Sequence, residues 1–196
     1  MFSDWLRRIS RGLVDPVSRA LCRVGLEANT VTLIGGLFNI VVGVVIALGR
    51  LPLGGLLLIV AAGFDALDGA MARQLGRPTR FGAFFDSTLD RVSEIAIFGG
   101  LLWHYMAQGQ TLYALLSFLA LAGSVLVSYT RARAEGLGVE CKVGWFTRVE
   151  RSLLTIIALI AGVMPYALWV LMVGTWFTSG QRMWHVYRTV RDEPLA

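Results

Sequence analysis

Residues 51–90 read LPLGGLLLIVAAGFDALDGAMARQLGRPTRFGAFFDSTLD, and the order of apolar and acidic residues in this stretch decides the fold. An apolar run at 53–72 carries two aspartates near its end. A short turn at 76–79 separates it from a second apolar run, which begins at 82 and carries two more aspartates. Because the turn is short, the two runs are expected to form antiparallel neighbouring helices with four carboxylates at one end.

The composition of the whole chain is that of a membrane protein. Of its 196 residues, 56% are hydrophobic and 16% are charged, and the mean hydropathy is +0.64. A soluble domain carries roughly 25% charged residues, so an ordinary cytosolic globule is excluded. At about 20 apolar residues per bilayer crossing, the uncharged stretches suffice for roughly six helices. Residues 1–196 are therefore expected to form one all-α integral membrane domain with six transmembrane helices.

Short turns divide the rest of the chain in the same way. Before the apolar runs, residues 1–24 place apolar side chains at steps of three and four, with Arg7, Arg8 and Arg11 on the other side. This pattern is typical of an amphipathic helix at the membrane interface. Residues 25–196 are expected to form the six-helix bundle. The predicted spans are 31–49, 53–72, 82–107, 111–134, 149–163 and 165–183.

The positive charges predict how the chain is oriented. In this layout, 17 of the 18 Lys and Arg residues fall on one side of the membrane, and only Arg50 falls on the other. Lys and Arg concentrate on the cytoplasmic side of membrane proteins, so both termini are expected in the cytosol. The formal charge of +5 and the pI near 9.8 are explained by these flanking residues and do not indicate nucleic-acid binding.

The four carboxylates predict a metal site. Asp65 and Asp68 are three residues apart and Asp86 and Asp90 are four apart, so each pair shares one helix face. Like charges that converge in this way require a cation between them. Hard oxygen donors suit Mg²⁺ or Mn²⁺, and four of them are enough for a site with two metal ions.

Two other interpretations of the carboxylates involve no reaction. The acids can pair with Arg73, Arg80 and Arg91 as structural ion pairs in a non-catalytic membrane scaffold. They can also line an ion or proton pathway, since intramembrane carboxylates occur in transporters. Their position at one membrane face, away from the midplane, and the lack of a broken-helix pair in the sequence disfavour transport.

The acidic stretch resembles the signature of the CDP-alcohol phosphotransferase family, which is D-x-x-D-G-x-x-A-R-x8-G-x-x-x-D-x-x-x-D. The resemblance implies an enzyme that displaces CMP from a CDP-linked lipid with an alcohol, using two Mg²⁺ or Mn²⁺ ions. It also implies six spans, a prokaryotic plasma-membrane location with a cytosolic active site, and a homodimer. The matching residues are Asp65, Asp68, Gly69, Ala72, Arg73, Gly82, Asp86 and Asp90.

The resemblance also assigns roles to single residues. It makes Asp65, Asp68 and Asp86 metal ligands, and Asp90 both a metal ligand and the base that takes the proton of the attacking hydroxyl. Position 28 departs from the family pattern, because Ala28 stands where many relatives have proline. The implied contacts to the CDP group are Thr32, Asp68, Gly69, Arg73, Thr79 and Gly82.

Arginines outside the signature predict the acceptor alcohol. The segments around Arg131, Arg151 and Arg182 resemble those of prokaryotic phosphatidylinositol-phosphate synthases, with arginine at 131 where the mycobacterial relatives have lysine. Because guanidinium groups suit phosphate oxygens, these three are expected to bind a phosphorylated acceptor. The predicted reaction transfers the phosphatidyl group of CDP-diacylglycerol to inositol 3-phosphate and releases CMP. Glycerol 3-phosphate, as in phosphatidylglycerophosphate synthases, is the alternative acceptor, and an archaeal lipid is an alternative donor.

Overall fold

The computed structural model describes residues 14–74 and 79–191, which are helical apart from turns and loops. Residues 14–23 are helical, in agreement with the end of the predicted interfacial helix, and residues 1–13 of that helix lie outside the described part. No strand occurs among the described residues. The helices are α2 (Ala28–Ala47), α3 (Leu51–Gln74), α4 (Arg80–Ala107), α5 (Thr111–Glu135), α6 (Arg148–Ala161) and α7 (Met164–Val190).

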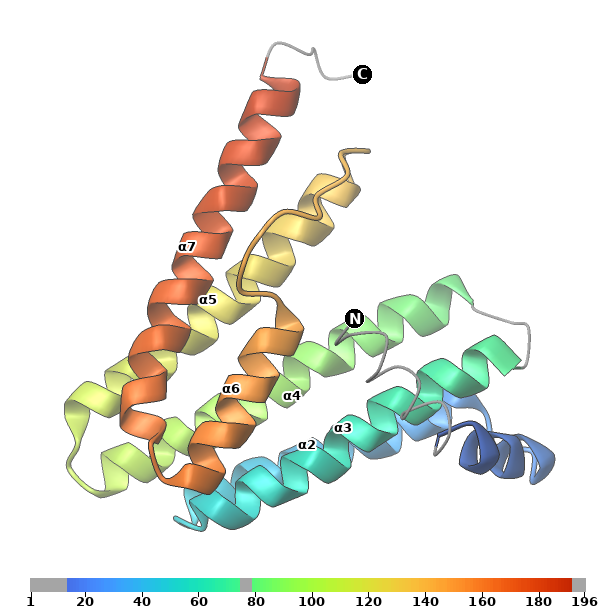
Figure 1. Cartoon of the computed structure of the whole chain (residues 1–196), viewed down its shortest axis with the longest axis horizontal. Coiled ribbons are helices and arrows are strands. Elements are labelled where there is room, and N and C mark those ends of the chain that lie inside the picture. The colour runs from blue at the N-terminus through green and yellow to red at the C-terminus, as the bar shows by residue number, and fades with distance from the viewer. Residues whose placement is uncertain (1–13, 75–78, 192–196) are drawn as a thin grey trace.

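The helices run up and down in chain order and form one bundle (Figure 1). Helix α2 packs against α3 and α4, α5 packs against α4 and α7, and α6 packs against α3 and α7. The α2–α3, α4–α5 and α6–α7 turns lie at one end of the bundle (Figure 1). The ends of α3, α5 and α7 and the starts of α4 and α6 therefore lie toward the opposite end, where the sequence places its acids.

Apolar side chains both fill the bundle and cover its outside. Ile46, Leu101 and Leu168 are fully buried, whereas Val41 and Val44 on the other face of α2 are each 54% exposed. Among the described helices, α2, α3 and α5 are long and apolar enough to cross a membrane by length and composition. The structure thus supports membrane-spanning helices, and the count of six spans stays a prediction.

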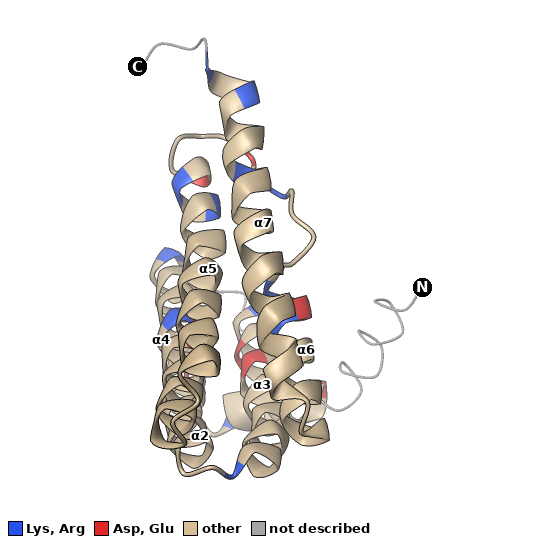
Figure 2. Ribbon diagram, turned by 90° about the vertical axis from the view of Figure 1, so that its left-hand side faces the viewer, with Lys and Arg blue, Asp and Glu red and all other residues tan. Residues whose placement is uncertain are grey.

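The charged residues are distributed unevenly along the bundle (Figure 2). Figure 2 shows blue and red segments in the upper and middle parts of the ribbon, while the end with the three short turns is almost entirely tan. Arg50, next to the α2–α3 turn, is the residue that the sequence places apart from the other cations. The ends of the bundle therefore differ in charge as the predicted orientation requires.

The last helix is longer than its apolar run predicts. The predicted span stops at 183, but α7 continues to Val190. Val186 and Val190 pack against a small buried cluster formed by the end of α5 and the following loop, which contains Ala134, Val139 and Cys141. This tertiary contact, rather than local hydropathy, extends the helix.

Glycines allow α2 and α4 to approach closely. A Cβ atom added at Gly43 would overlap the carbonyl oxygen of Ala96, and one added at Gly100 would overlap the carbonyl oxygen of Gly43. The Gly43→Ala substitution is therefore expected to destabilise the bundle by about 1–3 kcal/mol, measured as a lower melting temperature in detergent. Gly63→Ala is the matched control, because nothing lies within 4 Å of a Cβ there. Equal melting temperatures for the two variants would contradict this account of the α2–α4 contact.

Candidate functional site

The two acidic helices predicted from residues 51–90 form an antiparallel pair, called the hairpin below, which places the four aspartates at the charged end of the bundle. The prediction that they are direct neighbours is wrong, because α3 and α4 do not pack on each other and α2 packs against both. Asp65 and Asp68 lie toward the end of α3, and Asp86 and Asp90 lie in the first half of α4. Helix α4 begins after Thr79, whose hydroxyl accepts a hydrogen bond of 2.9 Å from the backbone N–H of Gly82. This N-cap fixes where α4 starts and hence which face carries its two acids.

The four carboxylates converge, as their spacing predicts. Asp86 lies close enough to interact electrostatically with Asp65, Asp68 and Asp90. Asp68 is only 7% exposed, and its buried Oδ2 atom has no hydrogen-bond partner. A buried carboxylate oxygen is costly to leave unpaired, so a ligand that accepts its lone pairs would stabilise this arrangement.

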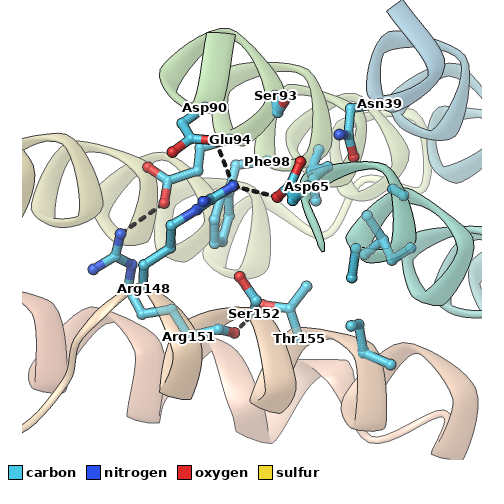
Figure 3. Close-up of a pocket in the computed structure, with 15 residues that line it drawn as sticks. Asn39, Asp65, Asp90, Ser93, Glu94, Phe98, Arg148, Arg151, Ser152 and Thr155 are labelled. Atoms are coloured by element: carbon cyan, nitrogen blue, oxygen red, sulfur yellow. Dashed lines mark hydrogen bonds and ion pairs between the residues drawn. The ribbon is translucent and has the colours of Figure 1, made fainter. Parts of the chain in front are cut away.

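An arginine from another helix joins one acid of each pair, Asp65 and Asp90 (Figure 3). The Nη2 atom of Arg148, at the start of α6, is 2.6 Å from Oδ2 of Asp65 and also forms an ion pair with Oδ1 of Asp90. In this arrangement, no three acidic, histidine or cysteine side chains within 14–74 and 79–191 are placed to hold a metal ion. The donors nevertheless fit a divalent cation, because they are hard oxygens, one is unpaired, and two already share a cationic partner.

A cavity of about 210 Å³ lies beside the hairpin, between α2, α3 and α4. This hairpin cavity is lined by five of the six residues predicted to contact the CDP group. A Cβ at Gly82 would lie 3.0 Å from Oγ1 of Thr79 and 3.2 Å from Oδ1 of Asn29, so a side chain there would press on both residues. The predicted residues that line the cavity are Thr32, Asp68, Gly69, Thr79 and Gly82.

The sixth predicted contact, Arg73, is not among the residues that line the hairpin cavity. Its guanidinium lies over Gly69, with Nη1 3.4 Å from the position that a Cβ of Gly69 would take. Arg73 and Gly69 are one helical turn apart on α3, as the sequence spacing requires. The side chain of Arg73 is thus beside the cavity without forming its wall.

A second cavity, of about 530 Å³, lies between α4, α5, α6 and α7. The three arginines predicted to bind the acceptor phosphate, Arg131, Arg151 and Arg182, all line this arginine cavity. They come from α5, α6 and α7, and Arg91 and Arg148 add two further guanidinium groups. The structure therefore brings together cations that lie far apart in the sequence, on four different helices.

The three predicted arginines are held in different ways. Arg151, whose side chain is 4% exposed, donates a hydrogen bond of 2.6 Å to Oε1 of Glu94. Arg182 donates to two backbone carbonyls, a 3.0 Å bond to Val143 and a second bond to Val127. Arg131 is half exposed and pairs with Glu135 at 2.8 Å. Because carbonyls orient Arg182 without neutralising it, its charge is available to an anionic ligand.

A third, smaller cavity of about 80 Å³ continues from the carboxylates into the bundle (Figure 3). Asp65, Asp90, Glu94, Arg148 and Arg151 line it together with polar and apolar residues from deeper in the bundle. The deeper lining residues include Asn39, Leu58, Ala61, Ser93, Phe98 and Thr155. The ion pairs thus lie between this inner cavity and the arginine cavity.

The sequence prediction did not include Glu94 and Arg148 among the site residues. Both had a signal in their spacing: Glu94 follows Asp90 by four residues on α4, and Arg148 precedes Arg151 by three on α6. Each therefore lies one helical turn from a predicted site residue, on the same face. Their pairing partners lie on other helices, so the sequence alone does not identify them.

The whole fold and the signature agree with those of known proteins. Residues 26–180 match the family model for CDP-alcohol phosphatidyltransferase. The phosphatidylinositol phosphate synthase of Mycobacterium marinum is 38% identical over 189 residues, covering 89% of this chain and 80% of that protein. The archaetidylinositol phosphate synthase of Methanothermobacter thermautotrophicus is also 38% identical, over 191 residues and 94% of each chain.

Solved structures show the same architecture. The crystal structure of Mycobacterium tuberculosis phosphatidylinositol phosphate synthase with CDP-DAG bound matches with a TM-score of 0.88 at 31% identity, covering 94% of this chain and 98% of that chain. The structure of the same enzyme in complex with manganese and citrate also has a TM-score of 0.88 and covers 94% of each chain. This chain therefore belongs to the CDP-alcohol phosphatidyltransferase family.

Proposed function

We propose that this protein is a phosphatidylinositol-phosphate synthase, which transfers the phosphatidyl group of CDP-diacylglycerol to inositol 3-phosphate and releases CMP. One observation carries the proposal: Asp86 lines both the hairpin cavity and the arginine cavity. A nucleotide in the first and a phosphorylated alcohol in the second would therefore meet at the same carboxylates. Such a shared boundary is what direct transfer between two bound substrates requires.

The relatives support the acceptor more strongly than the lipid. The mycobacterial relatives are named phosphatidylinositol phosphate synthases and the archaeal relative an archaetidylinositol phosphate synthase. Their names share the inositol phosphate and differ in the lipid. One solved relative binds CDP-DAG, which favours the diacylglycerol donor for this chain.

The metal ions would be held by Asp65, Asp68, Asp86 and Asp90. Two Mg²⁺ or Mn²⁺ ions supply charge stabilisation for the pyrophosphate and for the departing CMP. A solved relative binds manganese, which supports the use of a divalent cation. The buried, unpaired Oδ2 of Asp68 is the donor on this chain that most needs such a partner.

The chain's own residues bind, orient and move a proton. Gly69 and Gly82 leave room for the nucleotide beside α3 and α4, and Arg73, whose guanidinium lies over Gly69, would pair with a phosphate of that nucleotide. Arg131, Arg151 and Arg182 bind the acceptor phosphate, which orients the hydroxyl toward the carboxylates. Asp90 takes the hydroxyl proton as the hydroxyl oxygen bonds to the lipid-linked phosphorus and the bond to CMP breaks.

The proposed topology follows from the charge distribution. Six helices, α2 to α7, cross the membrane, and the charged end of the bundle with both termini faces the cytosol. The protein lies in the plasma membrane of a prokaryote, where a water-soluble acceptor can reach the arginine cavity and the lipid donor can enter from the bilayer. Two copies associate as a homodimer, as the family resemblance implies.

CMP release by the detergent-purified protein tests the proposal. With CDP-diacylglycerol and Mg²⁺ or Mn²⁺, turnover is expected with inositol 3-phosphate and not with free inositol or serine, because the arginines need a phosphate to bind. Chelation by EDTA is expected to abolish turnover, and added metal to restore it. If glycerol 3-phosphate gives turnover and inositol 3-phosphate does not, the proposed mechanism stands and the acceptor is glycerol 3-phosphate. If no acceptor gives CMP release, the assignment is contradicted.

A further inference from the structure

The ion pairs of Arg148 occupy oxygen atoms that a metal ion would need. One nitrogen atom, Nη2, contacts Oδ2 of Asp65 on α3 and Oδ1 of Asp90 on α4. A single cationic group therefore links these two helices. Figure 3 shows the Arg148 side chain extending from α6 between these two acids. An oxygen that accepts a short, charge-assisted hydrogen bond along its lone pair cannot at the same time direct that lone pair to a metal ion.

Arg148 differs from Arg151, the other arginine of α6 that binds an acid. The side chain of Arg148 is 40% exposed, whereas that of Arg151 is 4% exposed and pairs with Glu94, which lies outside the signature. Displacing Arg151 would leave the buried Glu94 without its closest cation and with the longer 3.5 Å ion pair to Arg91. Displacing Arg148 from Asp65 and Asp90 would leave those acids to a metal ion, which replaces the lost positive charge.

The arginine cavity offers the side chain of Arg148 a second position. Arg148 lines the arginine cavity as well as the inner cavity, so open space adjoins its side chain on the side of the proposed acceptor. The backbone need not move, because the start of α6 is fixed by Thr147, whose N–H donates a 2.9 Å bond to Glu150. The exchange is therefore a local event in one side chain.

We propose that Arg148 is a displaceable cation that competes with divalent metal ions for Asp65 and Asp90, and that metal binding releases it into the arginine cavity. The inference rests on the proposed function, because it takes the signature carboxylates to be the metal ligands. It assigns Arg148 a positioning role: it neutralises the acids until the metal arrives and then adds positive charge where the acceptor phosphate binds.

A Mn²⁺ titration of the detergent-purified full chain, followed by the loss of the free-ion electron paramagnetic resonance signal, tests the competition. Arg148→Gln is expected to tighten Mn²⁺ binding about tenfold, within the roughly 5- to 150-fold range of typical coupling between linked binding events. Arg131→Gln is the charge-matched control. It removes a cation that lines the same cavity but pairs with Glu135 instead of with Asp65 or Asp90. It is expected to change the affinity less than about threefold, as screening of a partly exposed charge allows.

Melting temperatures give a second readout that does not depend on turnover. In EDTA, Arg148→Gln is expected to melt several degrees below the wild type, because Asp65 and Asp90 lose the cation that they share and Asp90 keeps the longer 3.6 Å ion pair with Arg91. With saturating Mn²⁺ the difference is expected to disappear, because Arg148 no longer contacts the acids in either protein. A difference of the same size in both conditions would overturn the inference, since Arg148 would then stay in place when metal is bound.

The outcomes separate this inference from the proposed function. Unchanged or weaker Mn²⁺ binding by Arg148→Gln, with loss of binding in Asp65→Asn, would leave the carboxylate metal site standing and overturn only the role of Arg148. Wild-type Mn²⁺ affinity in Asp65→Asn would contradict the metal site itself and both proposals. If Arg148→Gln does not fold, Arg148→Lys serves in its place, with a smaller gain in affinity expected because one ammonium group replaces the guanidinium.

Discussion

Replacement of Asp90 by asparagine is expected to lower kcat for CMP release by about 10²- to 10⁴-fold, which is the range that a general base contributes. Asparagine keeps the size and shape of the side chain but cannot take a proton from the acceptor hydroxyl. Asp90 has the position for this role, because it lines the arginine cavity and the inner cavity and is 11% exposed. The rate is measured under saturating substrates and metal.

A matched control separates loss of the base from loss of a negative charge. Glu140→Gln removes a carboxylate from the loop before α6, where Glu140 is exposed and pairs with Lys142. This variant is expected to keep wild-type kcat. A melting curve for Asp90→Asn establishes that the protein remains folded. Wild-type turnover by folded Asp90→Asn protein would show that another group takes the proton.

The Arg151→Ala substitution is expected to have two large effects. The KM for the phosphorylated acceptor should rise about ten- to a hundredfold, because a hydrogen-bonded ion pair with phosphate is lost. The free energy of unfolding should fall by about 1–3 kcal/mol, because the buried Glu94 loses its closest cation and keeps the longer 3.5 Å ion pair with Arg91. Initial rates at varied acceptor concentration and melting curves measure the two effects.

A second substitution separates binding from stability. Adding Glu94→Gln to Arg151→Ala removes the carboxylate that has lost its closest cation, and is expected to restore much of the stability while leaving the KM high. Arg131→Ala is the stability control, since an exposed ion pair contributes only about 0–1 kcal/mol. An equal rise in the KM for CDP-diacylglycerol would contradict the placement of Arg151 in the acceptor site.

Local sequence was sufficient to predict the helices and the antiparallel order of the two acidic ones, but not that α2 packs against both of them in place of a direct α3–α4 contact. Hydropathy and turn residues placed five of the six helices within a few residues of their observed ends, because both signals act over one or two helical turns. The same local periodicity put Asp65 with Asp68 and Asp86 with Asp90 on common faces. The exception is α7, which extends past its apolar run through the contact of Val186 with the α5 end.

The signature also identified most of the nucleotide side of the candidate site. Five of the six predicted CDP contacts line the hairpin cavity, and the three predicted acceptor arginines share the arginine cavity. These predictions rested on a family resemblance, because the sequence spacing does not reveal which cations on different helices lie close together. Spacing alone predicted the helix face of each arginine but not the residue with which it pairs.

The sequence by itself determined the membrane character, the helix order and the convergence of four acids, because hydropathy, short turns and helical spacing are local properties. Only the tertiary structure decided that Arg148 lies between Asp65 and Asp90, that Glu94 holds Arg151, and that Asp86 borders two cavities. Arg148 and Asp65 are 83 residues apart in the chain. Contacts at that separation depend on how α3, α4 and α6 pack together, and packing is a property of all their faces at once.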